Sequence, residues 1–312
     1  DNLDIMLAAR YDHYDDASAV KGRVTGQAKF LYRPTDWLKI RGGYGQTFRA
    51  PDMFNLYGES SGFEFVPDYS QPGCFDGTNY FCGYTQVPST RRADSSLTEE
   101  HGDDIGLGAI YNPIPNFTLT VDWYRIKLKD LVITESSADL VLKQWQCDNG
   151  VLESSSQLCA DIRSRVVRNG FGAIEQVVVQ PINQDSLTRQ GIDIRASYKF
   201  ESAKLGAFNF DLGYSKVLKF ELNRFAGDEP LDLKYGEPGA ATPGNGLSAG
   251  LSWYQPLTTG KAISAGLFVQ RQGRVKDYSG NQFLEPFYDV NLTVGYQLNA
   301  KTQARFSVNN LL

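Results

Sequence analysis

The sequence predicts an all-β fold, namely an antiparallel up-and-down transmembrane β-barrel with long extracellular loops. Three observations predict it. Apolar and polar residues alternate through eleven segments, short and long connections alternate between those segments, and the clearest segment carries a tyrosine near each end of its apolar face. Successive side chains of a strand point to opposite faces. A strand that separates lipid from a watery lumen needs one apolar and one polar face.

The clearest segment is 286–298. Its apolar face consists of Tyr288, Val290, Leu292, Val294, Tyr296 and Leu298, and its polar face of Asp289, Asn291, Thr293, Gly295 and Gln297. The two tyrosines lie eight positions apart, which corresponds to roughly 20 Å of height at ~3.3 Å per residue and ~40° of tilt. That height approaches the apolar band of an outer-membrane barrel, with an aromatic ring at each water boundary.

Ten further segments show the same alternation and complete the predicted wall. In one of them, for example, Val121 and Trp123 alternate with Asp122 and Tyr124. Each segment is predicted to form one strand that crosses the membrane. In chain order the segments are 3–12, 24–33, 38–44, 105–111, 117–124, 192–200, 208–215, 247–254, 263–270 and 304–309.

The connections between the segments alternate in length. The short ones are 34–36, 113–116, 201–205, 256–260 and 299–301, and the long ones are 49–97, 133–186, 223–244 and 274–285. Outer-membrane barrels have short periplasmic turns and long outer loops. A soluble β-sandwich also alternates apolar and polar residues, but it has no reason to keep every second connection brief. The long connections are therefore predicted to lie outside the cell.

The composition excludes several other classes of protein. The sequence has no run of 18 apolar residues, so a transmembrane helix is not expected. The net charge is −5, which argues against a nucleic-acid partner. The chain has 18 Phe and 17 Tyr but only 2 Met. That balance favours surfaces rich in interfacial rings.

Both ends of the sequence fall in or next to a strand pattern, and no secretion signal opens it. We therefore expect the chain to be an internal piece of a larger protein. An open sheet of eleven strands would leave two unpaired edges, which lipid does not tolerate. The partner strands are expected in sequence outside this chain.

The two longest loops carry cysteines and local structure signals. Cys74 with Cys82 and Cys147 with Cys159 are predicted to form disulfides, because an envelope location favours oxidation and the spacings do not suit a metal site. Ser136 or Ser137 is predicted to cap a helix that runs through Trp145. A second helix is expected over 157–167 and a strand over 174–180.

Several segments resemble the C-terminal half of TonB-dependent outer-membrane receptors. The most specific is Thr47-Phe48-Arg49-Ala50-Pro51, which follows a strand. The others are 9–14, 32–41, 43–45, 130–132, 190–193 and 306–311. The sequence departs from the family at 97–102, where Leu-Thr-Glu-Glu-His-Gly stands in place of the frequent Leu-x-Pro-Glu-x-Ser. The resemblance covers essentially the whole chain.

The resemblance implies a barrel of 22 strands that an N-terminal plug domain closes. Residues 1–312 would then be a partial barrel domain, with strands of about the eleventh to the twenty-first, without the plug, the TonB box or the last strand. It also implies an outer-membrane receptor of a Gram-negative bacterium that imports a scarce ligand with energy from TonB. The ligand would be a ferric siderophore, or alternatively cobalamin or an oligosaccharide. A passive porin and a surface adhesin remain the alternatives.

Two constellations that suggest chemistry have simpler interpretations. Residues 246–250 match Gly-x-Ser-x-Gly, but a hydrolase of that type needs a histidine after the serine, and His13 and His101 both precede it. We therefore do not expect an enzyme. Glu99, His101 and Asp103 would share a strand face, yet a solvated strand end is favoured over a cation site. No cofactor or metal is expected.

The loop from 54 to 84 is rich in aromatic residues and is our candidate for ligand contact, because rings bind aromatic or sugar faces with little loss of entropy. The rings could equally pack against one another. The adjacent pair Arg91 and Arg92 could meet an anion, although a solvated pair is favoured. The predicted ligand-binding residues are Arg49, Tyr57, Phe63, Phe65, Tyr69, Tyr80 and Tyr84.

Basic residues are predicted on both faces of the wall. Those expected in the lumen are Lys29, Arg33, Lys39, Arg41, Arg195 and Lys199. We expect them to pair with lumen acids such as Asp193 and Asp289, or with a plug. On the lipid side, Arg125, Lys127 and Lys129 continue the row of Trp123 and would suit outer-leaflet phosphates. The predicted partners are thus the lipid bilayer, lipopolysaccharide, TonB and a small-molecule or oligosaccharide ligand.

Overall fold

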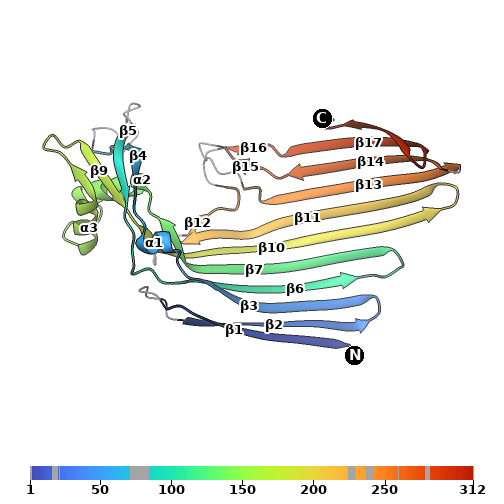
Figure 1. Cartoon of the computed structure of the whole chain (residues 1–312), viewed down its shortest axis with the longest axis horizontal. Coiled ribbons are helices and arrows are strands. Elements are labelled where there is room, and N and C mark those ends of the chain that lie inside the picture. Colours follow the sequence, from blue (N-terminus) through green and yellow to red (C-terminus); the bar gives the residue numbers. More distant parts are fainter. Residues whose placement is uncertain are drawn as a thin grey trace.

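The computed structural model describes residues 2–15, 20, 22–70, 84–223, 230–236, 242–258, 260–277 and 282–311. Eleven long strands follow one another in a single antiparallel sheet, and β12 (Leu231–Asp232) pairs with the C-terminal end of β11 (Gly206–Asn223) (Figure 1). These eleven strands are the eleven segments that the alternation predicts, in chain order. They are β1 (Leu3–His13), β2 (Gly22–Thr35), β3 (Leu38–Arg49), β6 (Glu100–Tyr111), β7 (Phe117–Thr134), β10 (Pro181–Ser202), β11 (Gly206–Asn223), β13 (Asn245–Thr258), β14 (Lys261–Gln272), β17 (Phe287–Asn299) and β18 (Thr302–Val308).

The register of the sheet brings the apolar positions of neighbouring strands onto one face. Ala196 of β10 pairs with Leu212, Leu212 with Ala249, Ala249 with Val269, and Val269 with Val290. Many members of this face are well exposed, and Leu7 is 75% exposed. Large exposed apolar surfaces mark contact with another protein or a membrane. The period-2 pattern of the sequence is therefore confirmed strand by strand.

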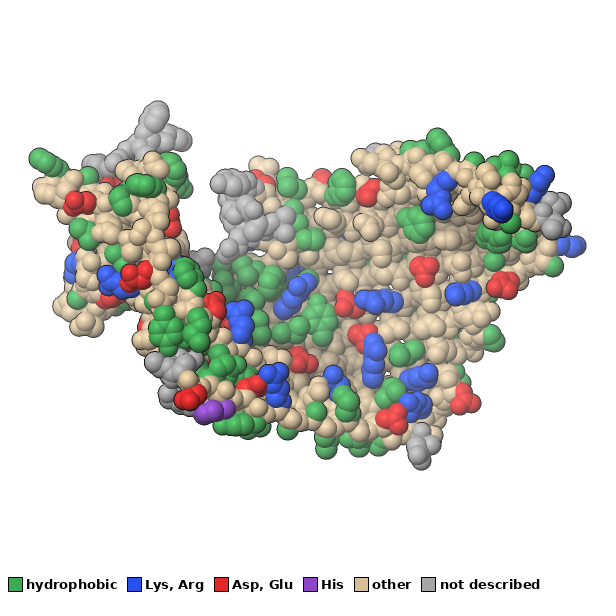
Figure 2. Space-filling view, in the orientation of Figure 1, with side chains coloured by type: hydrophobic (Ala, Val, Ile, Leu, Met, Phe, Trp, Pro, Cys, Tyr) green, Lys and Arg blue, Asp and Glu red, His purple; other side chains and the backbone are tan. Residues whose placement is uncertain are grey.

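The opposite face is polar. Figure 2 shows basic and acidic side chains scattered along the strands, while hydrophobic side chains gather toward the margins of the sheet. Two of the predicted lumen bases have carboxylate partners, at 2.7 and 2.6 Å: these pairs are Arg41–Asp122 and Arg33–Asp4. The expected acids, Asp193 and Asp289, form no ion pair among the described residues. Arg41 reaches Asp122 across Gly108, the residue that lies between them in the register.

Figure 1 places all short turns at one end of the sheet and the long connections at the other. β7 and β10 extend well beyond the predicted segments 117–124 and 192–200, up to Thr134 and down to Pro181. The alternation is irregular in these extensions. Asp130 has a positive φ of 56°, and the register of β10 against β11 shifts at Gln190/Gly191. No helix among the described residues is both long and apolar enough to cross a membrane.

Beyond the end of the sheet that carries the long connections, the two longest connections fold together (Figure 1). We call this unit, residues 60–70, 84–91 and 136–179, the outer lobe. Its four-stranded sheet has the order β4 (Ser60–Pro67), β5 (Tyr84–Arg91), β9 (Ile174–Val179) and β8 (Val166–Arg168). β5 and β9 pair in parallel, which joins the first long connection to the second. A short helix, α1 (Met53–Tyr57), lies where the lobe meets the main sheet (Figure 1). A separate two-stranded ribbon, β15 (Val275–Lys276) with β16 (Phe283–Leu284), belongs to the connection between β14 and β17.

Two helices, which the sequence predicts, pack against the lobe sheet. α2 (Ser137–Asp148) is capped by Ser136, whose side chain accepts the Asp139 N–H. α3 (Gln157–Arg165) is capped in the same way by Ser156. The predicted end of the second helix at Val167 is wrong, because Val166–Arg168 leaves the helix and pairs with β9 as β8.

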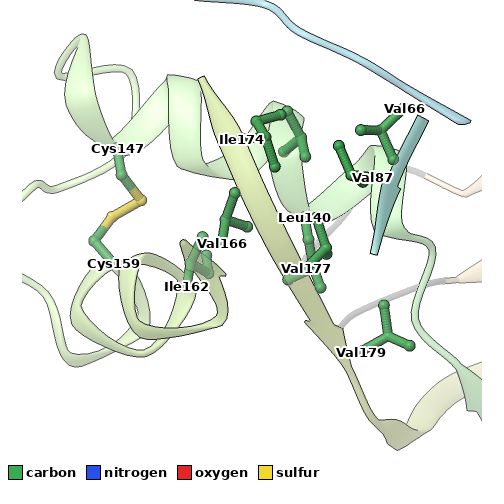
Figure 3. Close-up of a cluster of buried hydrophobic side chains, with 11 residues drawn as sticks. Val66, Val87, Leu140, Cys147, Cys159, Ile162, Val166, Ile174, Val177 and Val179 are labelled. Carbon is green, nitrogen blue, oxygen red and sulfur yellow. A yellow bond between two sulfur atoms is a disulfide. The ribbon is translucent and has the colours of Figure 1, made fainter. Parts of the chain in front are cut away.

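The lobe has its own hydrophobic core. Figure 3 shows Ile162 and Val166 near Val177, with Val66 and Val87 from the other long connection. The disulfide Cys147–Cys159 joins α2 to α3, with 5.6 Å between the Cα atoms. Cys74 and Cys82 lie outside the described residues. Since both connections contribute to one core, the lobe is a folded unit rather than two separate loops.

Charged contacts inside the lobe predict a pH dependence. Burial alone would raise the pKa of the Asp68 carboxyl, but hydrogen bonds from Arg168 and Ser70 outweigh it and hold that pKa below its usual range. The hydrogen bonds to ionised Asp68 therefore stabilise the folded lobe fully at a pH above the unfolded pKa of about 3.9. This stabilisation is lost as the pH falls through the lower pKa that Asp68 has in the folded protein. We expect the lobe to unfold at a lower temperature at pH 3 than at pH 5. The Arg168→Gln variant should show a smaller difference between the two pH values. An unchanged difference would contradict this assignment.

Candidate ligand-binding site

Arg49 stands at the outer end of β3, on the polar face. Its guanidinium donates to the Glu100 carboxylate at 2.6 Å, and this hydrogen bond raises the pKa of Arg49. Glu100 is 9% exposed and also accepts the Val132 N–H at 2.8 Å. The Arg49 side chain itself is 72% exposed. One edge of the guanidinium is thus fixed, while its other donors face solvent and can meet an anionic ligand.

Side chains at the rim join the long connections and the lobe to the main sheet. The Asn183 amide donates to the carbonyls of Thr98 and Asp130 at 3.0 and 2.7 Å, and accepts the Thr98 N–H at 2.9 Å. Arg91 lies over the Phe54 ring at 4.5 Å and donates to Thr134 at 3.2 Å. Arg91 is therefore committed to α1 and β7, unlike the solvated pair that the sequence suggests.

Three of the predicted ring residues share one exposed face of the lobe. In the register of β4 and β5, Phe63 pairs with Pro88, Phe65 with Gln86, and Pro67 with Tyr84, so these side chains lie on the same side. Phe63, Phe65 and Tyr84 are 69%, 64% and 69% exposed. The other side of the same two strands carries Val66 and Val87 into the lobe core. We call Phe63, Phe65 and Tyr84 the ring face.

The remaining predicted residues lie apart from the ring face. Tyr69 packs against the lobe core, and burial raises the pKa of its hydroxyl. Tyr57 ends α1 and is 48% exposed. Tyr80 lies outside the described residues. The structure thus places Arg49 on the rim of the main sheet, three rings on the lobe surface and Tyr69 against the lobe core.

A cleft that the sequence did not indicate lies between α2 and the outer ends of β7, β10 and β11. Its volume is about 630 Å³. The cleft combines residues from three separate stretches of chain, which explains why no local pattern could reveal it. Its apolar lining consists of Ile133, Leu140, Leu142, Leu152, Leu158, Ile182 and Leu222, and its polar lining includes Lys143, Gln146 and Gln184. Such a mixture is typical of small-molecule sites.

The described residues that suggested a hydrolase site or a cation site in the sequence do not form such sites in the structure. Ser248 lies within β13, where it pairs with Gly213 and Gln270 rather than sitting on a strand-to-helix turn. The Nε2 of His101 is 3.8 Å from Glu99 and 3.9 Å from Asp130. Among the residues that the structure describes, no group of three or more His, Cys, Asp or Glu side chains could hold a metal ion.

The chain also shares sequence and fold with known proteins. The hemin receptor of Yersinia pestis is 28% identical over 138 residues, which cover 42% of this chain and 19% of that protein. The hemin receptor of Yersinia enterocolitica is 24% identical over 143 residues, which cover 44% of this chain and 19% of that protein. The chain therefore spans about a fifth of the curated relatives that it matches.

Solved structures match almost the whole chain. The ferric enterobactin receptor of Pseudomonas aeruginosa superposes with a TM-score of 0.61 at 15% identity, covering 100% of this chain and 38% of that one. The siderophore receptor PirA of Acinetobacter baumannii gives a TM-score of 0.62 at 13% identity, covering 99% of this chain and 39% of that one. The FrpB iron transporter of Neisseria meningitidis gives a TM-score of 0.59 at 14% identity, covering 100% of this chain and 39% of that one. At these identities the likeness concerns the fold alone.

The family model described as "TonB dependent receptor-like, beta-barrel" matches residues 1–311. This match extends over every strand of the main sheet and over the outer lobe. Both faces of the sheet have the character that an outer-membrane barrel requires. The chain belongs to the TonB-dependent receptor family, and it forms part of that family's outer-membrane β-barrel.

Proposed function

We propose that the whole protein imports an iron-bearing ligand, hemin or a ferric siderophore, across the outer membrane of a Gram-negative bacterium with energy from TonB. The observation that carries this proposal is the family match over residues 1–311. Residues 1–312 would supply about the eleventh to the twenty-first of 22 strands, with the plug contributed by sequence outside this chain. The protein would perform no chemistry on its ligand.

The choice of ligand class rests on the relatives and on the chemistry of the lobe. The curated relatives are hemin receptors, and the solved neighbours include a ferric enterobactin receptor. Hemin and catecholate siderophores both combine flat conjugated rings with anionic oxygens. Aromatic side chains bind such rings, and arginine binds such oxygens. We therefore place hemin and ferric siderophores ahead of cobalamin and oligosaccharides.

We further propose that the ligand contacts the ring face and Arg49. Supporting this are the exposure of the three rings on one side of β4 and β5 and the open donors of Arg49. Tyr57 and Tyr80 are proposed as additional contacts. For Tyr69 we propose a supporting role, because it packs against the lobe core.

Removing the ring face should weaken ligand binding. The triple variant Phe63→Ala, Phe65→Ala, Tyr84→Ala is expected to raise the Kd at least about tenfold, since each stacked ring contributes roughly 0.5–1.5 kcal/mol. The measurement is a titration of the full-length receptor with hemin and, separately, with a ferric catecholate. Phe171→Ala is the matched control, because Phe171 is also on the lobe and is 99% exposed. Equal affinity of the triple variant and the control for both ligands would refute this assignment.

Transport in cells distinguishes the import proposal from its alternatives. Uptake of radioactive iron, supplied as hemin or as a ferric catecholate, should saturate with concentration and should stop in cells that lack TonB. A porin would give uptake that continues without TonB and rises linearly with concentration. An adhesin would give surface binding with no uptake in either strain.

A further inference from the structure

A row of basic side chains continues the apolar face of β7 above the membrane. Trp123 pairs with Leu107 of β6 and with Ile192 of β10, which places its side chain on the apolar face. Side chains two residues apart on a strand share a face. Three bases, Arg125, Lys127 and Lys129, therefore follow Trp123 on the outer surface.

A fourth base, on another strand of the same sheet face, joins this row. Lys216 of β11 pairs with Ile192, so it lies on the same outer face, two strands away from Trp123. Arg125, Lys129 and Lys216 are exposed, and Lys127 is partly exposed. We call Arg125, Lys127, Lys129 and Lys216 the basic stripe.

Within the part of the chain that the structure describes, the basic stripe has no carboxylate partner at ion-pair distance. None of its four members forms an ion pair with any residue that the structure describes, whereas Arg33, Arg41 and Arg49 on the opposite face all do. Asp103, opposite Lys127 in the register, accepts the Tyr44 hydroxyl at 2.6 Å. A second nearby acid, Glu221, pairs with Lys219 at 2.7 Å.

The height of the stripe identifies the anion that it suits. A tryptophan at the edge of an apolar face marks the level of the headgroups. From Arg125 to Lys129 the stripe rises by roughly 10 Å, at ~3.3 Å per residue and ~40° of tilt. A phospholipid presents a single layer of phosphates, which is thinner than this rise. Lipopolysaccharide stacks the phosphates of lipid A beneath further anionic groups on its core sugars, so it presents charge over a comparable depth.

We infer that the basic stripe is a binding site for the phosphates of lipopolysaccharide. The inference rests on the proposed outer-membrane location and identifies the residues through which this part of the barrel would contact the outer leaflet. Each of the four bases is attracted by an anionic lipid surface, and none of them is neutralised by a carboxylate among the described residues. Lysine stems can also lie along the apolar face while their ammonium groups reach the phosphates.

The test compares charge removal on the two faces of the barrel. Full-length receptor, refolded in detergent free of lipopolysaccharide, is titrated with purified lipopolysaccharide and with phosphatidylglycerol vesicles. The stripe variant replaces all four stripe residues by glutamine. The matched control variant replaces four lumen-side bases by glutamine: Lys29, Lys39, Arg195 and Lys199. Heat-modified gel mobility verifies folding, and Lys127→Gln with Lys129→Gln serves if the fourfold variant does not fold.

The stripe variant is expected to bind lipopolysaccharide at least about tenfold more weakly, with a shallower salt dependence, while the control keeps its affinity. Equal losses in both variants, or no loss in the stripe variant, would overturn the inference. So would equal losses toward lipopolysaccharide and phosphatidylglycerol, because the site would then be a general anionic-lipid surface. Uptake of hemin or ferric catecholate, measured on the same variants, tests the import function separately.

Discussion

Replacing Glu135 by alanine is expected to destabilise the outer lobe by about 3–5 kcal/mol, because the change leaves a buried arginine without its main partner. Glu135 forms an ion pair with Arg165, whose side chain is 7% exposed, and the Glu135 side chain is 11% exposed. Burial alone would lower the pKa of Arg165, but the hydrogen bonds that it donates to Glu135 and Asp161 raise that pKa on balance. The pair joins the end of β7 to α3, so its loss should loosen the lobe where it meets the barrel.

Hydrogen exchange of the lobe amides in the full-length receptor measures this effect. Exchange in α3 and β9 should accelerate by more than about a hundredfold in Glu135→Ala, since each 1.4 kcal/mol corresponds to a factor of ten. Asp161→Ala is the matched control, because Asp161 also pairs with Arg165 but its side chain is 44% exposed. The control should change exchange only slightly. Similar exchange in both variants would show that the buried pair does not hold the lobe.

A lysine in place of Leu292 is expected to cost about 2–4 kcal/mol, the penalty for a cation on the lipid face near the middle of a bilayer. Leu292 lies midway between Tyr288 and Tyr296, and it pairs with Leu267 on one side and Val308 on the other. Thr293→Lys is the control, because Thr293 is the next residue and faces the polar side, where Gly266 and Ser307 are its neighbours.

Reversible unfolding of the full-length receptor in lipid vesicles gives the two free energies. The free energy of unfolding of Leu292→Lys should fall well below that of the parent protein, whereas that of Thr293→Lys should remain within about 1 kcal/mol of it. If both lysines were tolerated equally, the apolar face would not be in contact with hydrocarbon.

The main sheet could be predicted because lipid and lumen impose one rule on every residue of a membrane-spanning strand. Val290, Leu292 and Val294 must be apolar and their neighbours polar, so the pattern alone identifies β17. Above the membrane this rule no longer holds. The upper part of β7 contains Asp130 in a left-handed conformation, and β10 shifts its register at Gln190/Gly191. The predicted segment 117–124 accordingly ends too early, and the predicted segment 192–200 begins too late.

The outer lobe shows a different limit. The first of its helices could be predicted because Ser136 caps it locally, and the structure adds Ser156 as the cap of the second. The parallel pairing of β5 with β9 could not, since it brings Ser89 next to Val177 from another connection. The same long-range contact decides which side of β4 is buried. The sequence marks Phe63 and Phe65 as ring residues but does not reveal that their side faces solvent and that Val66 faces the core.

The candidate site was predicted in part for the same reasons. Arg49 belongs to a recognisable motif, and the structure places it on the rim with open donors. Its partner Glu100 is set by the register of β3 against β6, which the sequence leaves open. The cleft beneath α2 depends on how three separate stretches meet, so only the structure reveals it.

Spin labels at each position from 290 to 294 of the full-length receptor in bilayers test the central claim, that lipid covers the apolar face of this sheet. The collision rate of each label is measured with oxygen, which concentrates in hydrocarbon, and with a water-soluble nickel complex. Positions 290, 292 and 294 should collide mainly with oxygen, and 291 and 293 should be less accessible to it. If labels at 290, 292 and 294 were shielded from both reagents, a second protein layer would cover this face, and the membrane-barrel account would be wrong.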